Sequence, residues 1–226
     1  MTFNFRRNMS QPPNFDQEDK LKSKGYKLIA GLDEAGRGAL AGPVVAGAVI
    51  LPSSSYPSWL KLVRDSKELS PRKREFLFNL ISQEALAVST GIVPSQVIDS
   101  VNILQATKLA MMQAVEKLPV TANFLLIDRL TLPQCSIPQR GVTKGDKLCF
   151  SIACASIVAK VTRDHIMEEF DKVYPGYGFA KHKGYGTRAH ISYLQQLGAL
   201  SIHRLSFAPV RNVAAGRISS PLMGED

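Results

Sequence analysis

The sequence predicts an α/β domain with a central mixed β-sheet that helices cover on both sides. Two apolar runs at residues 26–32 and 43–51 lie close together in the chain, as the two strands of a β-hairpin do. The first run is apolar from Leu28 to Leu32, so both of its faces should be covered. Further strands then alternate with helical patterns, which is typical of α/β layering.

Four strands are expected where a segment is rich in apolar residues and is bounded by glycine, proline, asparagine or charged residues, and a short last strand is expected after the surface excursion that Pro133 and Pro138 mark. The first two strands are connected by a glycine-rich turn. In chain order, the predicted strands span residues 26–32, 43–51, 86–93, 123–128 and 139–142.

Helices are expected where capping residues precede apolar periodicity. Ser70 with a following proline, Asn102 and Thr187 are good N-caps, and Pro94 suits the first turn of a short helix. Residues 151–156 are small, so the helix that they begin can approach a sheet closely. In chain order, the predicted helices span residues 16–24, 71–84, 94–99, 102–118, 149–171 and 187–197.

The chain divides into one large domain and two ends. Residues 1–24 are polar and carry two adjacent prolines, which predicts a flexible N-terminal arm that contains the short first helix. Residues 25–210 form the predicted domain, whose last part is helical, and residues 211–226 form a tail. No internal repeat is visible.

The charge of the chain suggests a polyanionic partner. There are 28 Lys and Arg residues against 19 Asp and Glu residues, which gives a net charge of +9. Nucleic acid is the first candidate, although a basic surface that serves only solubility is equally consistent with the charge alone. The basic residues cluster at 72–74, 144–147, 160–163 and 181–183.

The remaining composition indicates a cytoplasmic protein. Cys149 and Cys154 lie in an apolar segment and are expected as buried thiols, and no C-x-x-C pair occurs, which fits a reducing compartment. The N-terminus has no apolar signal-peptide core. The longest apolar stretch, residues 39–51, is too short and too interrupted by glycine and proline to span a bilayer.

Carboxylates at the ends of strands are the candidate catalytic groups. Asp33 and Glu34 follow one buried strand, Asp128 ends another, and Asp164 lies on the helix with the small-residue face. An aspartate at a strand end is commonly only a turn former. Together, however, four converging carboxylates need cations, and two Mg²⁺ or Mn²⁺ ions about 4 Å apart would suit phosphodiester hydrolysis. Gly36 and Gly38 would allow the bend that brings the first two acids together.

Several other site types are excluded. The glycine pattern at residues 36–42 is one residue too long for a dinucleotide fingerprint, and a strand follows it where that fingerprint needs a helix. Neither a G-x-x-x-x-G-K-[ST] phosphate loop nor a G-x-S-x-G nucleophile motif occurs. The four histidines have no zinc-ligand spacing with each other or with the cysteines.

Six motifs, in order along residues 26–210, resemble those of bacterial ribonuclease HII. They are Asp33-Glu34-Ala35-Gly36-Arg37-Gly38 with Gly42-Pro43-Val44-Val45-Ala46, Asp65-Ser66-Lys67-Glu68-Leu69-Ser70, Lys144-Gly145-Asp146, Ser151-Ile152-Ala153 through Lys160 to Arg163-Asp164, His182-Lys183-Gly184-Tyr185-Gly186-Thr187, and His203-Arg204-Leu205-Ser206-Phe207.

This resemblance implies a ribonuclease H-like fold and a two-metal endoribonuclease. Such an enzyme hydrolyses the RNA strand of RNA/DNA hybrids and nicks duplex DNA 5′ to embedded ribonucleotides, leaving 3′-hydroxyl and 5′-phosphate ends, with roles in ribonucleotide excision repair and primer removal. The resemblance also implies Mg²⁺ or Mn²⁺ as cofactor, a monomer with no obligate protein partner, and no membrane association. The catalytic, metal-binding acids would be Asp33, Glu34, Asp128 and Asp164.

The same resemblance implies the substrate contacts. The loop Gly36-Arg37-Gly38 would read the 2′-hydroxyl through backbone groups, which is the group that distinguishes RNA from DNA. Tyr185 would stack on the next sugar and sense the RNA-to-DNA junction. Phosphate and backbone contacts would come from Ser66, Lys67, Lys144, Lys181 and Lys183.

The sequence departs from the family pattern at Arg129, where glycine is usual after the third acid. Arg129 either crowds the metal site or adds a phosphate contact. The segment 134–140 is also long for its place. The sister family, ribonuclease HIII, has an extra N-terminal domain and a glutamate as fourth acid, so Asp164 and the short arm favour HII. The rival readings are a catalytically silent hybrid-binding protein and a DNA-junction nuclease of the same fold.

Overall fold

The computed structural model describes residues 12–52 and 56–216, and its centre is a five-stranded mixed sheet of order β3-β2-β1-β4-β5. β1 pairs with β2 and β2 with β3 in antiparallel fashion, whereas β1–β4 and β4–β5 are parallel. This confirms the mixed sheet that the sequence predicts. The strands are β1 (Ile29–Ala35), β2 (Val44–Ile50), β3 (Ala87–Val93), β4 (Phe124–Asp128) and β5 (Gln139–Val142).

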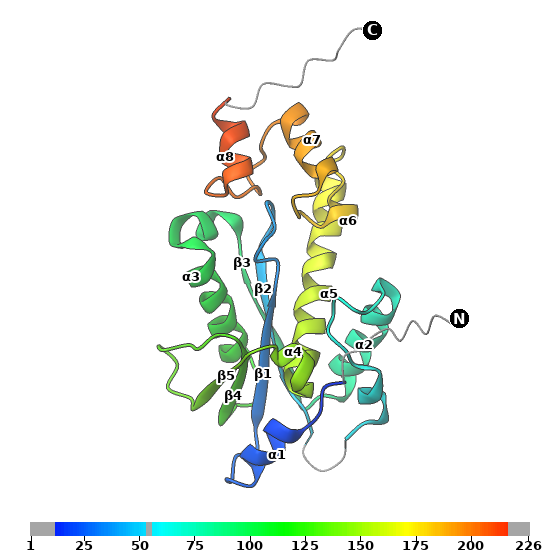
Figure 1. Ribbon diagram of the computed structural model, residues 1–226, viewed down its shortest axis with the longest axis vertical. Coiled ribbons are helices and arrows are strands. Elements are labelled where there is room, and N and C mark those ends of the chain that lie inside the picture. The colour runs from blue at the N-terminus through cyan, green and yellow to red at the C-terminus, as the bar shows by residue number, and fades with distance from the viewer. Residues whose placement is uncertain (1–11, 53–55, 217–226) are drawn as a thin grey trace, which may run out of the picture.

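Helices cover both faces of this sheet. In Figure 1, α3 lies on one side of the strands, α5 lies on the other with α2 outside it, and the C-terminal helices α7 and α8 gather at one end. The helices are α1 (Asp16–Lys22), α2 (Pro71–Glu84), α3 (Ser95–Glu116), α4 (Gly145–Leu148), α5 (Phe150–Val173), α6 (Phe179–His182), α7 (Arg188–Leu197) and α8 (Ala208–Ala214), with a short 3₁₀ turn η1 (Ser58–Leu62).

Glycines in the strands bring the helices unusually close to the sheet. A Cβ atom placed on Gly31 would lie 2.1 Å from the backbone carbonyl carbon of Ser151 in α5, and one on Gly91 would lie 1.9 Å from the carbonyl oxygen of Ala110 in α3. Such distances are far below van der Waals contact, so only glycine permits this packing. The small residues that begin α5 therefore face the sheet, as predicted.

The predicted helix caps are confirmed. The Ser70 hydroxyl accepts a hydrogen bond from the Lys73 N–H, and the Thr187 hydroxyl accepts one from the His190 N–H. Asn102 does cap a helix, but the two helices predicted on either side of it are joined in α3, which kinks where Asn102 takes φ 67° and ψ 165°. The reason is that the short first helix leads directly into the cap of the second.

Strand β1 extends further than the sequence predicts, and this changes the position of two acids. The pairing of β1 with β2 continues through Asp33 opposite Gly47, Glu34 opposite Ala46, and Ala35. Asp33 and Glu34 therefore lie inside the strand, where successive side chains alternate between its faces. The expectation that a bend at Gly36 and Gly38 would bring them together is wrong.

The two ends of the predicted domain are more ordered than expected. Residues 12–24 were predicted as part of a loose arm, but α1 packs on the domain with Leu21 only 2% exposed. The buried Glu18 carboxylate accepts hydrogen bonds from the Ser151 N–H and hydroxyl at the start of α5. At the other end, α8 occupies residues predicted as tail and buries Val210. The division of the chain at residues 24 and 210 stays a prediction.

Two further expectations concern the thiols and the membrane. Cys149 and Cys154 are buried free thiols, as predicted, and burial raises the pKa of both. Among the residues that the structure describes, none of the helices combines the length and the hydropathy that a bilayer-spanning segment needs.

Candidate active site

Asp33 lies at the bottom of the candidate site, near the end of β1. Its side chain is only 5% exposed, and its Oδ1 accepts a 2.7 Å hydrogen bond from the Glu34 N–H. Burial, and then the neighbouring charge of Glu34, raise the pKa of Asp33 well above its ordinary value. The hydroxyl of Ser156 on α5 opposes this shift without cancelling it. A carboxylate at this position is therefore destabilised unless a cation joins it.

Asp128 lies beside Asp33 because β4 runs parallel to β1. The register pairs Leu32 with Ile127, so the next residue of each strand is an acid. The negative charge of Asp128 contributes to the raised pKa of both Asp33 and Glu34. Its Oδ1 accepts a 2.8 Å hydrogen bond from the Gly145 N–H at the start of α4, which holds the side chain in place. The charges of Asp33, Glu34 and Asp128 therefore interact, and their convergence on a shared ion stays a prediction.

Glu34 has one carboxylate oxygen paired and one unpaired. Oε1 accepts a 3.2 Å hydrogen bond from Nη1 of Arg37, whereas Oε2 is buried and has no hydrogen-bond partner among the described residues. Burial raises the pKa of Glu34 despite the lowering effect of Arg37. An unpaired buried carboxylate oxygen beside two further acids fits a hard divalent cation, which prefers oxygen ligands.

Asp164, the fourth predicted acid, is paired with cationic side chains. It lies on α5, where Nζ of Lys160 is 2.7 Å from its Oδ1 and Nη2 of Arg74 is 3.8 Å from its Oδ2. Over residues 12–52 and 56–216, no three acidic, histidine or cysteine side chains already form an arrangement that could hold a metal ion. The structure therefore brings three of the predicted acids together and holds the fourth with cationic side chains.

Two adjoining clefts lie beside two of these acids: Glu34 lines the first and Asp164 lines the second, whereas Asp33 and Asp128 line neither. The first has a volume of about 450 Å³ and the second about 620 Å³, and they share Lys160 and Tyr185. Residues that line the first are Glu34, Ala35, Gly36, Arg37, Gly38, Ser66, Lys67, Ser156, Lys160 and Tyr185. Residues that line the second include Arg74, Lys160, Asp164, His165, Lys181, His182, Lys183, Tyr185 and Thr187.

Most of the predicted substrate residues thus line a cleft, but two differ from expectation. Lys144 is exposed and lines neither cleft, and its left-handed backbone starts the turn that presents the Gly145 N–H to Asp128. Lys183 lines the second cleft, but its ammonium is already paired with Glu168. Lys67 is 79% exposed and is the most open of the cationic groups around the first cleft.

The loop Gly36–Gly38 and Tyr185 lie next to each other. Ala39 forms an antiparallel bridge with Tyr185, and the Leu40 N–H donates to the Gly184 carbonyl oxygen at 2.8 Å. The Tyr185 ring is contacted from one side by cations, with Nζ of Lys160 at 5.6 Å and Cζ of Arg163 at 5.2 Å from its centroid. The ring therefore forms a fixed wall that both clefts share.

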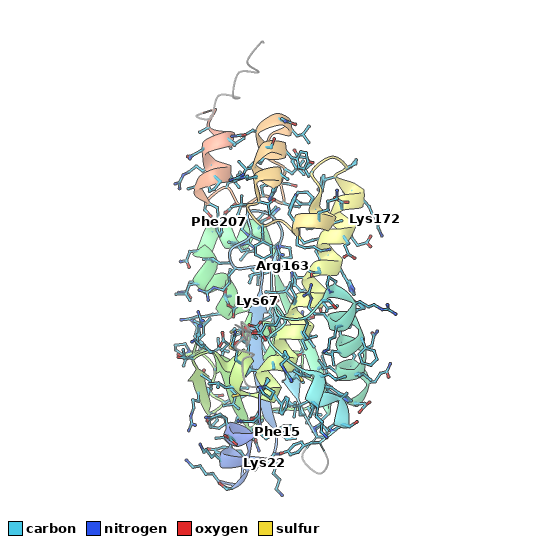
Figure 2. The ribbon with its side chains drawn as sticks, turned by 45° about the vertical axis from the view of Figure 1, so that its right-hand side comes forward. Phe15, Lys22, Lys67, Arg163, Lys172 and Phe207 are labelled. Carbon is cyan, nitrogen blue, oxygen red and sulfur yellow. The ribbon has the colours of Figure 1, made fainter. Side chains whose placement is uncertain are left out.

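Two buried arginines hold this arrangement, and neither was expected in this role. Arg163 was predicted as part of a basic surface cluster, but it is fully buried and donates to the carbonyl oxygens of Ala41, Pro43 and Lys183. Figure 2 shows Arg163 at mid-height of the molecule, just below the C-terminal helices and above Lys67. The sequence shows the charge of this residue but not the backbone carbonyl groups that accept its hydrogen bonds, one of which lies 120 residues away in the chain.

Arg204 performs the same task from the C-terminal part. Its guanidinium donates to the carbonyl oxygens of Gly36 at 2.7 Å, Arg37 at 2.8 Å, and Gly42 at 3.0 and 3.1 Å. Peptide groups are planar and trans, so the N–H that follows each held carbonyl points the opposite way. The N–H groups of Arg37 and Gly38 are therefore turned away from Arg204.

Three polar residues near the acids were also missed. Lys160 precedes Asp164 by one helical turn, and this i,i+4 spacing is a signal that the sequence does contain. Ser156 joins Ser66 through a 2.9 Å hydroxyl–hydroxyl hydrogen bond. Asp146 is buried, and its pKa is raised by burial and then by Asp65 and Asp128. It is the last residue of the motif Lys144-Gly145-Asp146, in which only Lys144 was predicted to contact substrate.

Arg129 takes a conformation that favours glycine. Its φ is 57°, in the left-handed region, which explains physically why glycine suits the position after the third acid. Nε of Arg129 lies 3.8 Å from Oδ2 of Asp128, while the side chain stays 62% exposed and lines neither cleft. Arg129 therefore leaves the first cleft open.

Known structures share this architecture. A crystal structure of ribonuclease H2 from Pyrococcus horikoshii OT3 superposes with a TM-score of 0.68 and 26% identity, over 84% of this chain and 98% of that one. The PCNA:RNase HII complex from Archaeoglobus fulgidus gives 0.62 at 23% identity, over 85% and 91%. Bst-RNase HIII in complex with Mn²⁺ gives 0.62 at 17%, over 84% and 70%. Fold and acids together define a nuclease of the ribonuclease H-like class.

Sequence comparison identifies the family within this class. The family model Ribonuclease HII matches residues 30–210. The chain is 54% identical to Ribonuclease HII of Dehalococcoides mccartyi strain BAV1 over 204 residues, which are 90% of this chain and 96% of the relative. The chain belongs to the ribonuclease HII family, whose members are metal-dependent endoribonucleases.

Proposed function

We propose that this chain nicks duplex DNA on the 5′ side of an embedded ribonucleotide and hydrolyses the RNA strand of RNA/DNA hybrids. The observation that carries the proposal is a group of three acids whose charges interact, Asp33, Glu34 and Asp128, of which Glu34 lines the same basic cleft as the loop Gly36–Gly38. The acids supply oxygen ligands for divalent ions, and the cationic lining suits a polyanionic strand. Products would carry 3′-hydroxyl and 5′-phosphate ends, as in ribonucleotide excision repair and primer removal.

Asp33, Glu34 and Asp128 are the proposed ligands of a first Mg²⁺ or Mn²⁺ ion, and Asp164 completes the site for a second. Such ions activate a water and stabilise the leaving oxygen of a phosphodiester. The residues fit a cation, because Glu34 Oε2 is buried and has no partner within the part of the chain that the structure describes. Burial and the neighbouring acids also raise the pKa of Asp33, so its carboxylate form needs a positive charge beside it. Asp164 must first exchange its contacts with Lys160 and Arg74.

The backbone of the loop is the proposed reader of the ribose. Arg204 fixes the carbonyls of Gly36 and Arg37, so the following N–H groups keep one direction. A 2′-hydroxyl can both donate and accept hydrogen bonds, and only RNA carries it. Tyr185 is the proposed platform for the next sugar, since its ring borders both clefts.

Phosphate contacts are proposed for the cations that line the clefts. Lys67 and Lys181 are exposed, Lys67 would leave a 3.9 Å contact with Oδ2 of Asp146 to reach a phosphate, and Ser66 lies at the wall of the first cleft. Lys183 would have to leave Glu168, and Lys144 would act from outside the clefts. These contacts position the strand and do not read its sequence.

The test is one nicking assay with matched substrates. Duplex DNA containing one ribonucleotide, the same duplex without it, and a long hybrid are incubated with Mg²⁺, Mn²⁺ or a chelator. The proposal expects a metal-dependent nick 5′ to the ribonucleotide, intact all-DNA duplex, and loss of cleavage in Asp33→Asn. Binding without cleavage would instead indicate a silent hybrid-binding protein, and cleavage of all-DNA junctions would indicate a DNA-junction nuclease.

The proposed partners are hybrid and ribonucleotide-containing duplexes, acted on by a monomer in the cytoplasm. The Archaeoglobus fulgidus relative is a complex with PCNA, so a protein partner is compatible with this fold, although the sequence reasoning expected none to be required. Size-exclusion chromatography with light scattering, with and without substrate, tests the monomer.

A further inference from the structure

Three histidines of the C-terminal part gather behind the Tyr185 loop. The ring centroids of His182 and His190 are 4.2 Å apart and nearly parallel, and those of His190 and His203 are 5.3 Å apart. His190 and His203 are at most 1% exposed. Their ring nitrogens form hydrogen bonds with backbone groups of residues 177, 184, 185 and 200 and with one another.

The hydrogen bonds of the pair His190–His203 allow only one order of protons. The Leu200 N–H donates to Nδ1 of His203 at 2.9 Å, so a neutral His203 carries its proton on Nε2. That Nε2 lies 3.2 Å from Nε2 of His190, which must therefore accept. The proton of His190 is then on Nδ1, which donates to the Tyr185 carbonyl oxygen at 3.0 Å.

Both histidines are neutral near physiological pH. Burial, followed by repulsion from the neighbouring histidine, lowers the pKa of each to about 4. A charged His190 would place two N–H donors against each other across the 3.2 Å contact, and a charged His203 would place its Nδ1–H against the Leu200 N–H. The hydrogen bonds therefore run in one direction, from the Leu200 N–H through His203 and His190 to the Tyr185 carbonyl oxygen.

The third histidine holds the other side of the same segment. The Gly184 N–H donates to Nδ1 of His182 at 3.1 Å, so Nε2 of His182 donates to the Tyr177 carbonyl oxygen at 2.7 Å. Two stacked imidazoles thus fix the N–H of Gly184 and the carbonyl of Tyr185. The intervening Gly184 carbonyl accepts from Leu40, next to the loop Gly36–Gly38.

We propose that His190 and His203 are positioning residues, whose ordered protons set the backbone of Tyr185 and so place its ring between the two clefts. This inference rests on the proposed function, in which Tyr185 senses the junction beyond a ribonucleotide. The pair acts on substrate selection and leaves the metal-binding acids unchanged. Long hybrids, which present no such junction at most cleavage positions, depend less on it.

The test compares His190→Ala with His190→Asn. An asparagine Nδ2 can reproduce the donor of Nδ1 toward the Tyr185 carbonyl, whereas alanine removes it. Loss of one buried hydrogen bond corresponds to roughly tenfold in rate. We expect kcat/KM on the single-ribonucleotide duplex to fall about tenfold in His190→Ala, kcat/KM on long hybrid to fall much less, and His190→Asn to recover most of the loss.

Two controls separate positioning from general loosening. Leu194→Ala removes a buried side chain of the same helix, and its melting temperature can be matched with that of His190→Ala. A selective loss in His190→Ala alone supports the proposal. An equal fall on both substrates, an equally selective loss in Leu194→Ala, or no recovery in His190→Asn would overturn it.

Long-range ¹H–¹⁵N spectra of the wild-type protein provide a readout independent of activity. They should show His203 protonated on Nε2 and His190 on Nδ1 at neutral pH, and the opposite order would overturn the proposal. Tyr185→Phe separates the positioning role proposed for the two histidines from the junction-sensing role proposed for Tyr185. If it lowers the ratio of the two activities and His190→Ala does not, only the positioning claim is wrong. If Tyr185→Phe leaves the ratio unchanged, the role proposed for Tyr185 is wrong.

Discussion

Replacing Arg204 by lysine should destabilise the protein and loosen the loop Gly36–Gly38. The guanidinium of Arg204 makes four hydrogen bonds to the carbonyls of Gly36, Arg37 and Gly42. A lysine ammonium keeps the charge but lacks the planar fork, so it cannot reach all three carbonyls from one position. Arg204→Lys therefore tests the geometry of the loop separately from its charge.

The expected magnitude follows from the number of carbonyls that are lost. We expect the ammonium to retain one of the three carbonyls and to lose its hydrogen bonds to the other two. Each unpaired buried group costs about 1–3 kcal/mol, and the Gly36 carbonyl still accepts from the Ala39 N–H at 3.3 Å, so the free energy of unfolding should fall by roughly 2–4 kcal/mol. A typical domain has about 5–15 kcal/mol of stability, which leaves the variant folded.

Urea unfolding and cleavage kinetics measure the two consequences. The midpoint should fall at an unchanged m-value, and discrimination between a ribonucleotide and a deoxyribonucleotide at the same position should weaken. Arg204→Met, which removes every donor, should be less stable than Arg204→Lys. A loss below 1 kcal/mol in Arg204→Lys, or unchanged discrimination, would refute this reasoning.

Three further predictions concern the acids, the sheet and the histidines. In chelator, Asp33→Asn should raise the melting temperature and increase the free energy of unfolding by on the order of 1 kcal/mol or more. The reason is that it removes a buried carboxylate whose pKa is raised by burial and by the neighbouring negative charges, and an unchanged or lower melting temperature would contradict this. Gly31→Ala should lower the free energy of unfolding, measured in urea, by about 1–3 kcal/mol or more, because its Cβ would overlap the backbone of Ser151; a neutral effect would mean that α5 moves freely. The free energy of unfolding should fall as the pH decreases from 6.5 toward 4, because His190 and His203 bind protons in the unfolded chain at these pH values but stay neutral in the folded protein, where their pKa values are lowered. The loss amounts to up to about 3 kcal/mol for each histidine. In urea unfolding at pH 7, 6 and 5, the double variant His190→Asn/His203→Gln should lose less stability with decreasing pH than the wild-type protein.

Local sequence patterns predict those parts of the fold that depend on neighbouring residues. The N-caps at Ser70 and Thr187 form as expected, and the acids of two strands meet because parallel neighbours end at the same edge of the sheet. The small residues of α5 predict its close approach to the sheet, and Gly31 and Gly47 on the facing strands complete that contact.

What the sequence does not contain are contacts between distant positions. The burial of Arg163 depends on the Ala41 and Pro43 carbonyls, and that of Arg204 depends on the loop some 160 residues earlier. A lone basic residue is expected at the surface, so both remain hidden to pattern analysis. The pairing of Lys160 with Asp164 was within reach, because it is an i,i+4 pair on one helix.

The most direct test of the account is to locate Mn²⁺ by anomalous scattering in crystals grown with an uncleavable ribonucleotide-containing duplex. The account predicts one ion bound at about 2.1 Å by carboxylate oxygens of Asp33, Glu34 and Asp128, and a second ion bound to Asp164 after it has released Lys160. Anomalous peaks that avoid the first three acids, or Glu34 still paired only with Arg37 while the duplex occupies the cleft, would contradict it.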